Sequence, residues 1–189
     1  MLNTPGNPGY HKKQISKVIW LTGLSGSGKT TISDALQLIL REKGYLVQAL
    51  DGDVLRKGLN SDLGFDMASR IENIRRAAEV SKILMDSGVI CICSFITPTI
   101  SIRQKVRQII GSENLIEIFV NAPLEVCEQR DVKGMYLKAR QGLIPEFTGI
   151  SSPFEDPDNA DIEIRTDLLS VEESVNKCLE TILPAIGGF

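Results

Sequence analysis

The sequence lacks both a long apolar run and a strong imbalance of charge. No run approaches the roughly 20 apolar residues of a membrane helix, and the start, MLNTPGNPGYHKKQ, has no apolar core like that of a secretory signal. The formal net charge is only −3, so bulk electrostatic attraction to nucleic acid is not expected. We therefore expect a cytoplasmic protein that binds neither membranes nor nucleic acid.

Cysteine and histidine are scarce as well, which narrows the chemistry to consider. The four cysteines are Cys91, Cys93, Cys127 and Cys178. Without a secretory signal we expect free thiols rather than disulfides. Cys91 and Cys93 lie within the apolar stretch 89–95, which favours a buried strand over a metal or redox site. The single histidine, His11, lies near the N-terminus and is expected to be solvated.

Apolar and amphipathic stretches alternate along the 189 residues, a length typical of one domain. Short apolar runs predict strands, and longer runs with helical periodicity predict helices. The predicted strands are 18–22, 46–50, 89–95, 115–121 and 162–165, and the predicted helices are 30–43, 71–87, 102–110, 123–130 and 171–183. This order is typical of an α/β fold with three layers, in which a central, mostly parallel sheet has helices on both faces.

Two segments depart from this alternation. Residues 1–16 contain several turn-forming Gly and Pro residues and few apolar ones, so we expect a flexible N-terminal tail before a domain at 17–189. Residues 131–157 carry Gly and Pro among charged and aromatic residues, with a short helix expected at 135–140. Such a long irregular stretch inside a compact domain is usually functional, so we predict a lid or binding loop.

The strongest motif directly follows the first predicted strand. Residues 23–30, GLSGSGKT, match the phosphate-binding pattern G-x-x-x-x-G-K-[ST] and open the first predicted helix, which indicates a P-loop NTPase fold. Its glycines let backbone N–H groups curl around a phosphate at the positive end of that helix. We expect Lys29 to reach the β- and γ-phosphates and Thr30 to ligate Mg²⁺. The predicted nucleotide-binding residues here are Gly23, Leu24, Ser25, Gly26, Ser27, Gly28, Lys29, Thr30 and Thr31.

The nucleotide is ATP or GTP by this motif alone. The pattern N-K-x-D that reads guanine is missing, because the Asn176-Lys177 pair is followed by Cys and Leu within a predicted helix. The sequence therefore gives no support to a GTPase, and we expect ATP with magnesium.

Two carboxylates, Asp51 and Asp53, end the second predicted strand, where ligands of open α/β sheets bind. A carboxylate there holds Mg²⁺ through water or accepts a proton from an attacking hydroxyl, and we favour Asp53 for the hydroxyl. The alternative is a plain strand-to-helix turn, since Asp and Gly form turns readily.

Several arginines follow this turn, which an anionic acceptor would explain. Arg56 comes first, and Arg70 and Asn73 are three residues apart on one predicted helix face, so these two are expected to meet one ligand. Arg75 and Arg76 point elsewhere and are interpreted as surface or ion-pair residues.

Together these segments resemble the adenylylsulfate kinase family from about residue 17 to the end. Besides the P-loop, the resemblance rests on LDGD at 50–53, LGF at 63–65, RIENIRR at 70–76, SFITP at 94–98, DVKG at 131–134 and FTGI at 147–150. It implies transfer of the γ-phosphate of ATP to the ribose 3′-hydroxyl of adenosine 5′-phosphosulfate (adenylylsulfate) in sulfate assimilation. The products would be 3′-phosphoadenylylsulfate and ADP, and the resemblance also implies a homodimer.

The resemblance assigns further site residues. It implies that the adenine of adenylylsulfate is held between Phe65 and Phe147, since stacking suits a flat, neutral base. The residues that it implies for gripping the phosphosulfate and ribose and closing the pocket are Arg56, Arg70, Asn73, Ile96, Thr97 and Lys133. For ATP it points to Arg130 against the adenine and to Thr166 beside it.

The sequence departs from the family pattern at some positions. Thr97 stands where relatives usually carry Ser, so we assign it to binding first, with a catalytic role open. Carboxylates or Tyr of the usual pattern are replaced at Ser69, Thr99, Ile102 and Ser151. We expect the loss of carboxylates at positions 69, 102 and 151 to loosen the orientation of arginines such as Arg70, Arg75 or Arg103.

Lys29, Asp53 and Thr97 are thus the predicted catalytic residues, with the lid excluding water during transfer. Two alternatives stay open. One is a P-loop kinase for another small acceptor, since the P-loop alone does not choose a substrate. The other is a catalytically weak nucleotide-binding partner of a sulfurylase.

Overall fold

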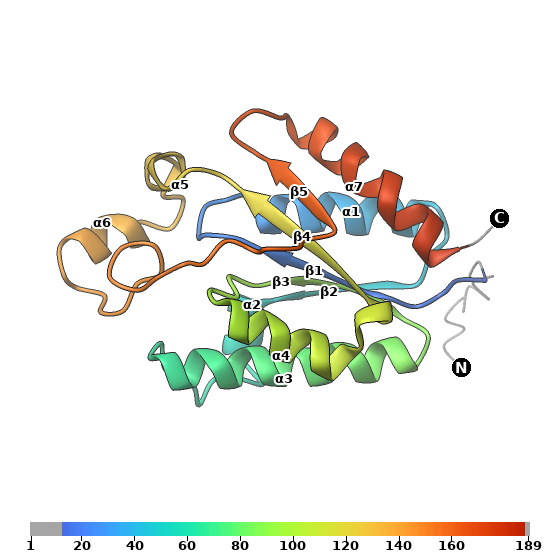
Figure 1. Ribbon diagram of the computed structural model, residues 1–189, viewed down its shortest axis with the longest axis horizontal. Helices are drawn as coiled ribbons and strands as arrows, with labels where there is room; N and C mark the ends of the chain where they lie inside the picture. Colours follow the sequence, from blue (N-terminus) through green and yellow to red (C-terminus); the bar gives the residue numbers. More distant parts are fainter. Residues whose placement is uncertain (1–12, 188–189) are drawn as a thin grey trace, which may run out of the picture.

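The computed structural model describes residues 13–187, and these form a five-stranded sheet between two layers of helices (Figure 1). The strands are β1 (Val18–Thr22), β2 (Val47–Asp51), β3 (Ile90–Ser94), β4 (Leu115–Asn121) and β5 (Ile162–Arg165). The helices are α1 (Lys29–Glu42), α2 (Gly52–Arg56), α3 (Met67–Asp86), α4 (Ile100–Ile110), α5 (Leu124–Arg130), α6 (Met135–Arg140) and α7 (Val171–Ile186), with a 3₁₀ turn η1 (Ser112–Asn114).

The sheet has the order β2-β3-β1-β4-β5, and every pairing between these strands is parallel. β1 and β3 are buried at all five positions, because helices cover both faces and leave no solvent side. The predicted α/β fold with three layers is confirmed.

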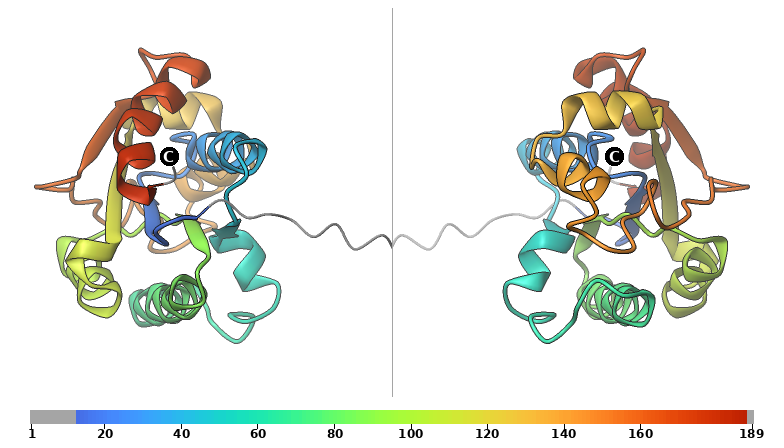
Figure 2. Two further views of the ribbon diagram at one scale, coloured as in Figure 1. Left: turned by 90° about the vertical axis from the view of Figure 1, so that its right-hand side faces the viewer. Right: turned by 90° about the vertical axis from the view of Figure 1, so that its left-hand side faces the viewer.

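The two faces have separate hydrophobic cores. On one face α1 and α7 pack on the sheet through residues such as Leu36, Ile92 and Ile182. On the other face α3 and α4 pack through Trp20, Ile74 and Val106. Figure 2 shows these layers on opposite sides of the sheet, and Figure 1 shows the segment that contains α6 at one end of the molecule.

Three helices depart most from the sequence prediction. Asp51 caps a short helix, α2, by accepting the N–H of Asp53 at 2.8 Å, so the predicted turn continues into one helical turn. α3 begins at Met67, because Asp66 accepts the N–H of Ser69 at 3.0 Å. α7 continues through Pro184 to Ile186, whose buried side chain extends the apolar face of the helix.

The N-terminal tail predicted at residues 1–16, including His11, lies largely outside the described residues. At its end, the N–H of Ile15 donates to the carbonyl of Ile186 at 2.6 Å, and the Gln14 side chain bonds the backbone of Leu46 and Gly88. All four cysteines are buried, free thiols, as predicted. Within residues 13–187, no helix is long and apolar enough to cross a membrane.

Candidate active site

A cavity of about 1510 Å³ opens at the carboxyl ends of the strands, where the P-loop, α2, the start of α3, the loop after β3 and the 131–157 segment meet. Most of the predicted site residues line it, although they come from segments far apart in the sequence. Those in the lining are Ser25, Gly26, Gly28, Lys29, Thr30, Thr31, Asp53, Arg56, Phe65, Arg70, Asn73, Ile96, Thr97, Arg130, Lys133, Phe147 and Thr166. Gly23, Leu24 and Ser27 belong to the loop but do not line the cavity.

The P-loop has the backbone that its glycines permit. Gly23, Gly26 and Gly28 have φ of 150°, 74° and 101°, which side chains rarely adopt. A Cβ on Gly23 would also lie 2.3 Å from the carbonyl oxygen of Val120, so glycine is required there for space as well. The loop then opens α1, whose N-terminus presents backbone N–H groups and positive dipole to the cavity.

Lys29 is folded onto its own loop. Its ammonium donates to the carbonyl oxygens of Gly23 at 3.0 Å and Leu24 at 2.7 Å. Burial is the largest influence on this group and lowers the pKa of Lys29 to about 8, while the nearby carboxylates of Asp51 and Asp53 oppose the shift. An anion in the cradle would favour the charged form of this lysine.

Thr30 and Asp51 form an oxygen-rich corner beside the P-loop. The Thr30 hydroxyl donates to Asp51 Oδ2 at 3.0 Å, while Asp51 Oδ1 accepts the N–H of Asp53 and so caps α2. A hydroxyl and a carboxylate are the hard ligands that Mg²⁺ prefers. Within residues 13–187 no group of three or more His, Cys, Asp or Glu side chains is arranged to hold a metal.

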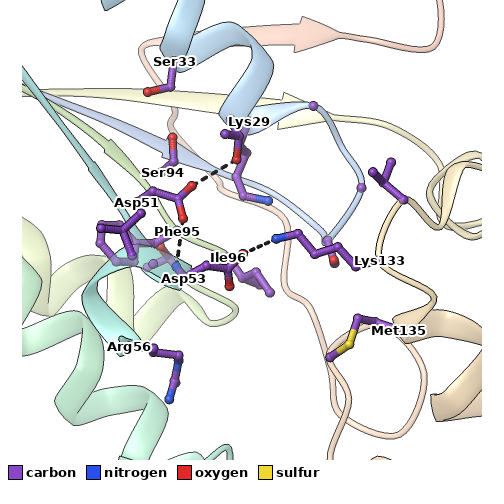
Figure 3. Close-up of a pocket in the computed structure, with 18 of the residues that line it drawn as sticks. Lys29, Ser33, Asp51, Asp53, Arg56, Ser94, Phe95, Ile96, Lys133 and Met135 are labelled. Atoms are coloured by element: carbon purple, nitrogen blue, oxygen red, sulfur yellow. Dashed lines mark hydrogen bonds and ion pairs between the residues drawn. The ribbon is translucent and has the colours of Figure 1, made fainter. Parts of the chain in front are cut away.

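Asp53 and Lys133 meet across the cavity. Asp53 lies in the first turn of α2, and its carboxylate forms an ion pair with the ammonium of Lys133 from the 131–157 segment (Figure 3). Both side chains are about 60% exposed, at 62% and 60%. The carboxylate is therefore accessible to a ligand that enters between α2 and this segment.

The two aromatic rings assigned to the acceptor adenine face the same cavity but differ in their surroundings. Phe65 is 55% exposed, and the guanidinium of Arg56 lies 4.4 Å from its ring centroid. Phe147 is 7% exposed and packs edge-on against Tyr136, with centroids 5.0 Å apart at 74°. Phe147 is thus held in place by packing, whereas Phe65 is covered by the Arg56 guanidinium, which donates to the carbonyls of Leu63 at 3.1 Å and Gly64 at 2.8 Å.

Arg70 braces the surroundings of both rings. Its guanidinium donates to the carbonyl of Phe65 at 2.7 Å, to the carbonyl of Glu146 at 2.8 Å and to the hydroxyl of Thr148 at 3.1 Å. Asn73, one turn further along α3, is buried and accepts from the Asn60 amide at 2.9 Å. Both residues line the same cavity, and their contact with one ligand stays a prediction.

The remaining arginines have partners other than the replaced carboxylates. Arg75 and Arg76 bond Glu72 on the outer side of α3, and Arg76 also pairs with Asp62, in agreement with their predicted ion-pair role. Arg103 is 6% exposed and bonds the Thr97, Glu155 and Asp156 carbonyls. The expectation that lost carboxylates would loosen Arg75 and Arg103 was therefore wrong, because other carboxylates and backbone carbonyls hold them.

Thr97 is fully buried and has a φ of 47°, a region that side chains rarely occupy. Its hydroxyl accepts from the Trp20 indole at 2.9 Å, and its carbonyl accepts from Arg103. The neighbouring Ile96 carbonyl accepts from Thr22 at 2.7 Å. This loop is therefore fixed from three sides, and the Thr97 hydroxyl is engaged with Trp20, so the binding and catalytic roles of Thr97 stay predictions.

Arg130 and Thr166 join each other on the other flank of the P-loop. The Arg130 guanidinium donates to the Thr166 carbonyl at 2.7 Å and to the Gly26 carbonyl at 3.2 Å. The Thr166 hydroxyl donates to the Ser27 carbonyl at 2.7 Å. These two predicted ATP residues thus lie together against the phosphate-binding loop.

Comparison with known proteins agrees with this geometry. The family model described as adenylylsulphate kinase matches residues 15–165. The chain belongs to the adenylylsulphate kinase family. The adenylyl-sulfate kinase of Bacteroides thetaiotaomicron is 54% identical over 92% of this chain and 86% of its own length, and that of Halothermothrix orenii is 54% identical over 89% and 90%.

A solved member of the family has the same fold. The APS kinase CysC of Mycobacterium tuberculosis, in complex with AMPPNP and APS, superposes with a TM-score of 0.84 at 42% identity, over 87% of this chain and 96% of that one. The resemblance to the adenylylsulfate kinase family, found in the P-loop, DGD, DVKG and FTGI segments, is thus confirmed.

Two residues that line the cavity, Asp51 and Tyr136, were not among the predicted site residues. Asp51 had a signal, since it shares the strand end with Asp53, but its bond to Thr30 depends on the fold. Tyr136 carried no signal, and its partner, the Ser25 carbonyl, is 111 residues away in the chain.

Proposed function

We propose that this protein is an ATP-dependent kinase that phosphorylates the ribose 3′-hydroxyl of adenylylsulfate, giving 3′-phosphoadenylylsulfate and ADP. One observation carries the proposal: a single cavity joins a P-loop to a site with two aromatic rings and several cations, and Asp53 lies between them. This supports a donor and an anionic, purine-bearing acceptor in the same chamber. Family membership supports the same activity.

In the proposed reaction the 3′-oxygen attacks the γ-phosphorus in line. A bond forms between these atoms, the bond from phosphorus to the β–γ bridging oxygen breaks, and ADP leaves. Asp53 orients the 3′-hydroxyl and accepts its proton, while Lys29 and the P-loop N–H groups stabilise charge on the transferring group. Thr30 and Asp51 would hold Mg²⁺, which when bound neutralises charge on the β- and γ-phosphates.

Acceptor binding depends on the cationic wall and the rings. Arg56 would exchange its contact with Phe65 for the phosphosulfate, leaving that ring to stack on adenine opposite Phe147. Lys133 would leave Asp53 and contact the same anion. The 131–157 segment carries Lys133 and Phe147 together, which supports its proposed role as a lid that excludes water.

Release of ADP tests the activity directly. Purified protein with Mg-ATP should release ADP only when adenylylsulfate is present, and Asp53→Ala and Lys29→Ala should each abolish that release. If the wild type instead turns over a different small acceptor, the protein is a P-loop kinase for that acceptor. If it binds ATP but shows no acceptor-dependent turnover, the result favours the hypothesis of a nucleotide-binding partner of a sulfurylase. We also propose that the protein is a homodimer. Light scattering tests this by measuring the molar mass in solution.

A further inference from the structure

Tyr136 in α6 joins the two halves of the site. It is 2% exposed and belongs to a small cluster of buried residues, with Ala122, Cys127 and Phe147, behind the P-loop. Its hydroxyl donates to the Ser25 carbonyl of the P-loop at 2.9 Å, and its ring meets the edge of Phe147. One side chain therefore contacts both the P-loop, which is the proposed phosphate-binding site, and Phe147, which is proposed to stack on the acceptor adenine.

The hydrogen bond fixes the direction of one peptide in the cradle. In a trans peptide the carbonyl and the N–H point in opposite directions, so a Ser25 carbonyl held by Tyr136 turns the Gly26 N–H away from it. Gly26 has a φ of 74°, and glycine reverses such a peptide at little steric cost. The orientation of this N–H thus depends on its partner rather than on the backbone itself. Burial raises the pKa of the Tyr136 phenol above its ordinary value, which keeps the hydroxyl a donor.

The ring contact restrains the acceptor side. Phe147 packs at 74° on the Tyr136 ring, and its own N–H donates to the Ser151 hydroxyl at 2.9 Å. The start of α6 is held in turn, because the Asp131 carboxylate accepts the N–H groups of Tyr136 and Leu137, each at 3.0 Å. Movement of Phe147 by a bound base is therefore transmitted to Tyr136 and not absorbed by a loose helix end.

We propose that Tyr136 is a positioning residue that couples occupancy of the acceptor site to the geometry of the phosphate cradle. The inference rests on the proposed function. A base seated on Phe147 fixes the Tyr136 ring, the hydroxyl then holds the Ser25–Gly26 peptide, and the cradle binds the nucleotide phosphates more tightly. Because coupling between sites is reciprocal, bound nucleotide tightens acceptor binding by the same factor.

Tyr136→Phe tests the coupling, since it removes the hydroxyl and keeps the ring. Calorimetry would measure the affinity of a non-hydrolysable ATP analogue with and without saturating adenylylsulfate. We expect at least a fivefold tightening in the wild type and less than twofold in Tyr136→Phe. In kinetics at saturating Mg-ATP this variant should lose about 5–20-fold in kcat, and its KM for adenylylsulfate should rise about threefold or more, because bound nucleotide no longer tightens acceptor binding.

Tyr45→Phe is the matched control. Tyr45 is also buried, and its hydroxyl donates to the Gly187 carbonyl at 2.7 Å, at the opposite end of the sheet. It should keep both the coupling and kcat while losing a comparable hydrogen bond. Phe147→Leu removes the ring contact with Tyr136. In this variant adenylylsulfate should tighten binding of the ATP analogue less than twofold, whatever the effect of the substitution on acceptor affinity.

Wild-type coupling and kcat in Tyr136→Phe would overturn the inference, as would a wild type that shows no coupling. Both results leave the proposed function intact if the wild type turns over adenylylsulfate. Absence of that turnover is the separate result that removes the function itself.

Discussion

Lys133 forms an ion pair with Asp53 across the mouth of the cavity, from positions 80 residues apart in the chain. The pair places the lid cation on the carboxylate that is proposed to receive the acceptor proton. Both groups are well exposed, so the pair itself stabilises the protein little, and a ligand with an anionic group exchanges it readily. In the structure, therefore, two residues of the proposed acceptor site are paired with each other.

Replacing Lys133 should weaken the binding of adenylylsulfate more than it slows the phosphoryl-transfer step. In Lys133→Ala we expect the KM for adenylylsulfate to rise about tenfold with kcat within about threefold, because a charge-assisted contact to the bound anion is lost. Lys138→Ala, which removes an exposed lysine from the same segment, should leave both values unchanged. Steady-state kinetics with varied adenylylsulfate measures this. Equal loss in both variants would argue against a specific contact of Lys133.

Asp51→Asn should raise the magnesium requirement. The amide still caps α2 through its oxygen but removes the charge beside Thr30. We expect the Mg²⁺ concentration for half-maximal activity to rise about tenfold, with the melting temperature close to that of the wild type. Electron paramagnetic resonance of Mn²⁺ bound with ADP gives a readout independent of turnover. Unchanged metal affinity would remove Asp51 from the metal site.

Nucleotide affinity should fall as pH rises through about 8. Burial lowers the pKa of free-state Lys29 from 10.5 to about 8, and phosphate binds the charged form. Binding near pH 8.5 should therefore take up protons, seen as a dependence of the binding enthalpy on buffer ionisation. The same shift means that the unfolded chain binds more protons between pH 8 and 10.5, so this group's contribution to stability increases with pH across that window.

Lys29→Met provides the comparison for this pH effect. Its nucleotide binding should be weaker, and the proton uptake near pH 8.5 should disappear. Persistence of the uptake in Lys29→Met would assign it to another group.

Arg103→Met should destabilise the protein and disturb the acceptor loop. Its buried guanidinium holds the carbonyls of Thr97, Glu155 and Asp156, and their loss leaves buried acceptors without donors. We expect the free energy of unfolding to fall by about 3 kcal/mol and the KM for adenylylsulfate to rise. Urea denaturation and steady-state kinetics measure the two effects.

Arg107→Met separates the roles of the two arginines. Arg103 also pairs with the buried carboxylate of Glu117 at 3.7 Å, and Arg107 bonds this carboxylate at 2.7 Å. Within residues 13–187, Arg107 has no hydrogen bond to the loop that contains Thr97. It should lower stability while leaving the KM for adenylylsulfate near the wild-type value. If the KM for adenylylsulfate rises equally in both variants, the loop is positioned through Glu117 rather than through the hydrogen bond from Arg103 to Thr97.

The sequence by itself determined the layers of the fold and the phosphate cradle. Strands 18–22, 115–121 and 162–165 and the helix at 135–140 were predicted with their observed bounds, because apolar periodicity is a local property. The P-loop is also local: its glycines, Lys29 and Thr30 are consecutive residues whose spacing fixes their chemistry.

Only the tertiary structure decided how the acceptor half is assembled. The bonds of Lys133 to Asp53, Arg70 to Glu146 and Tyr136 to Ser25 span 76 to 111 residues. The short helix α2 follows β2 at the position where the sequence also allowed a plain turn. The Asp51 side chain caps this helix by accepting the N–H of Asp53. Periodicity records which face of a segment is buried but not which distant segment buries it, so these pairings follow from packing of the whole chain.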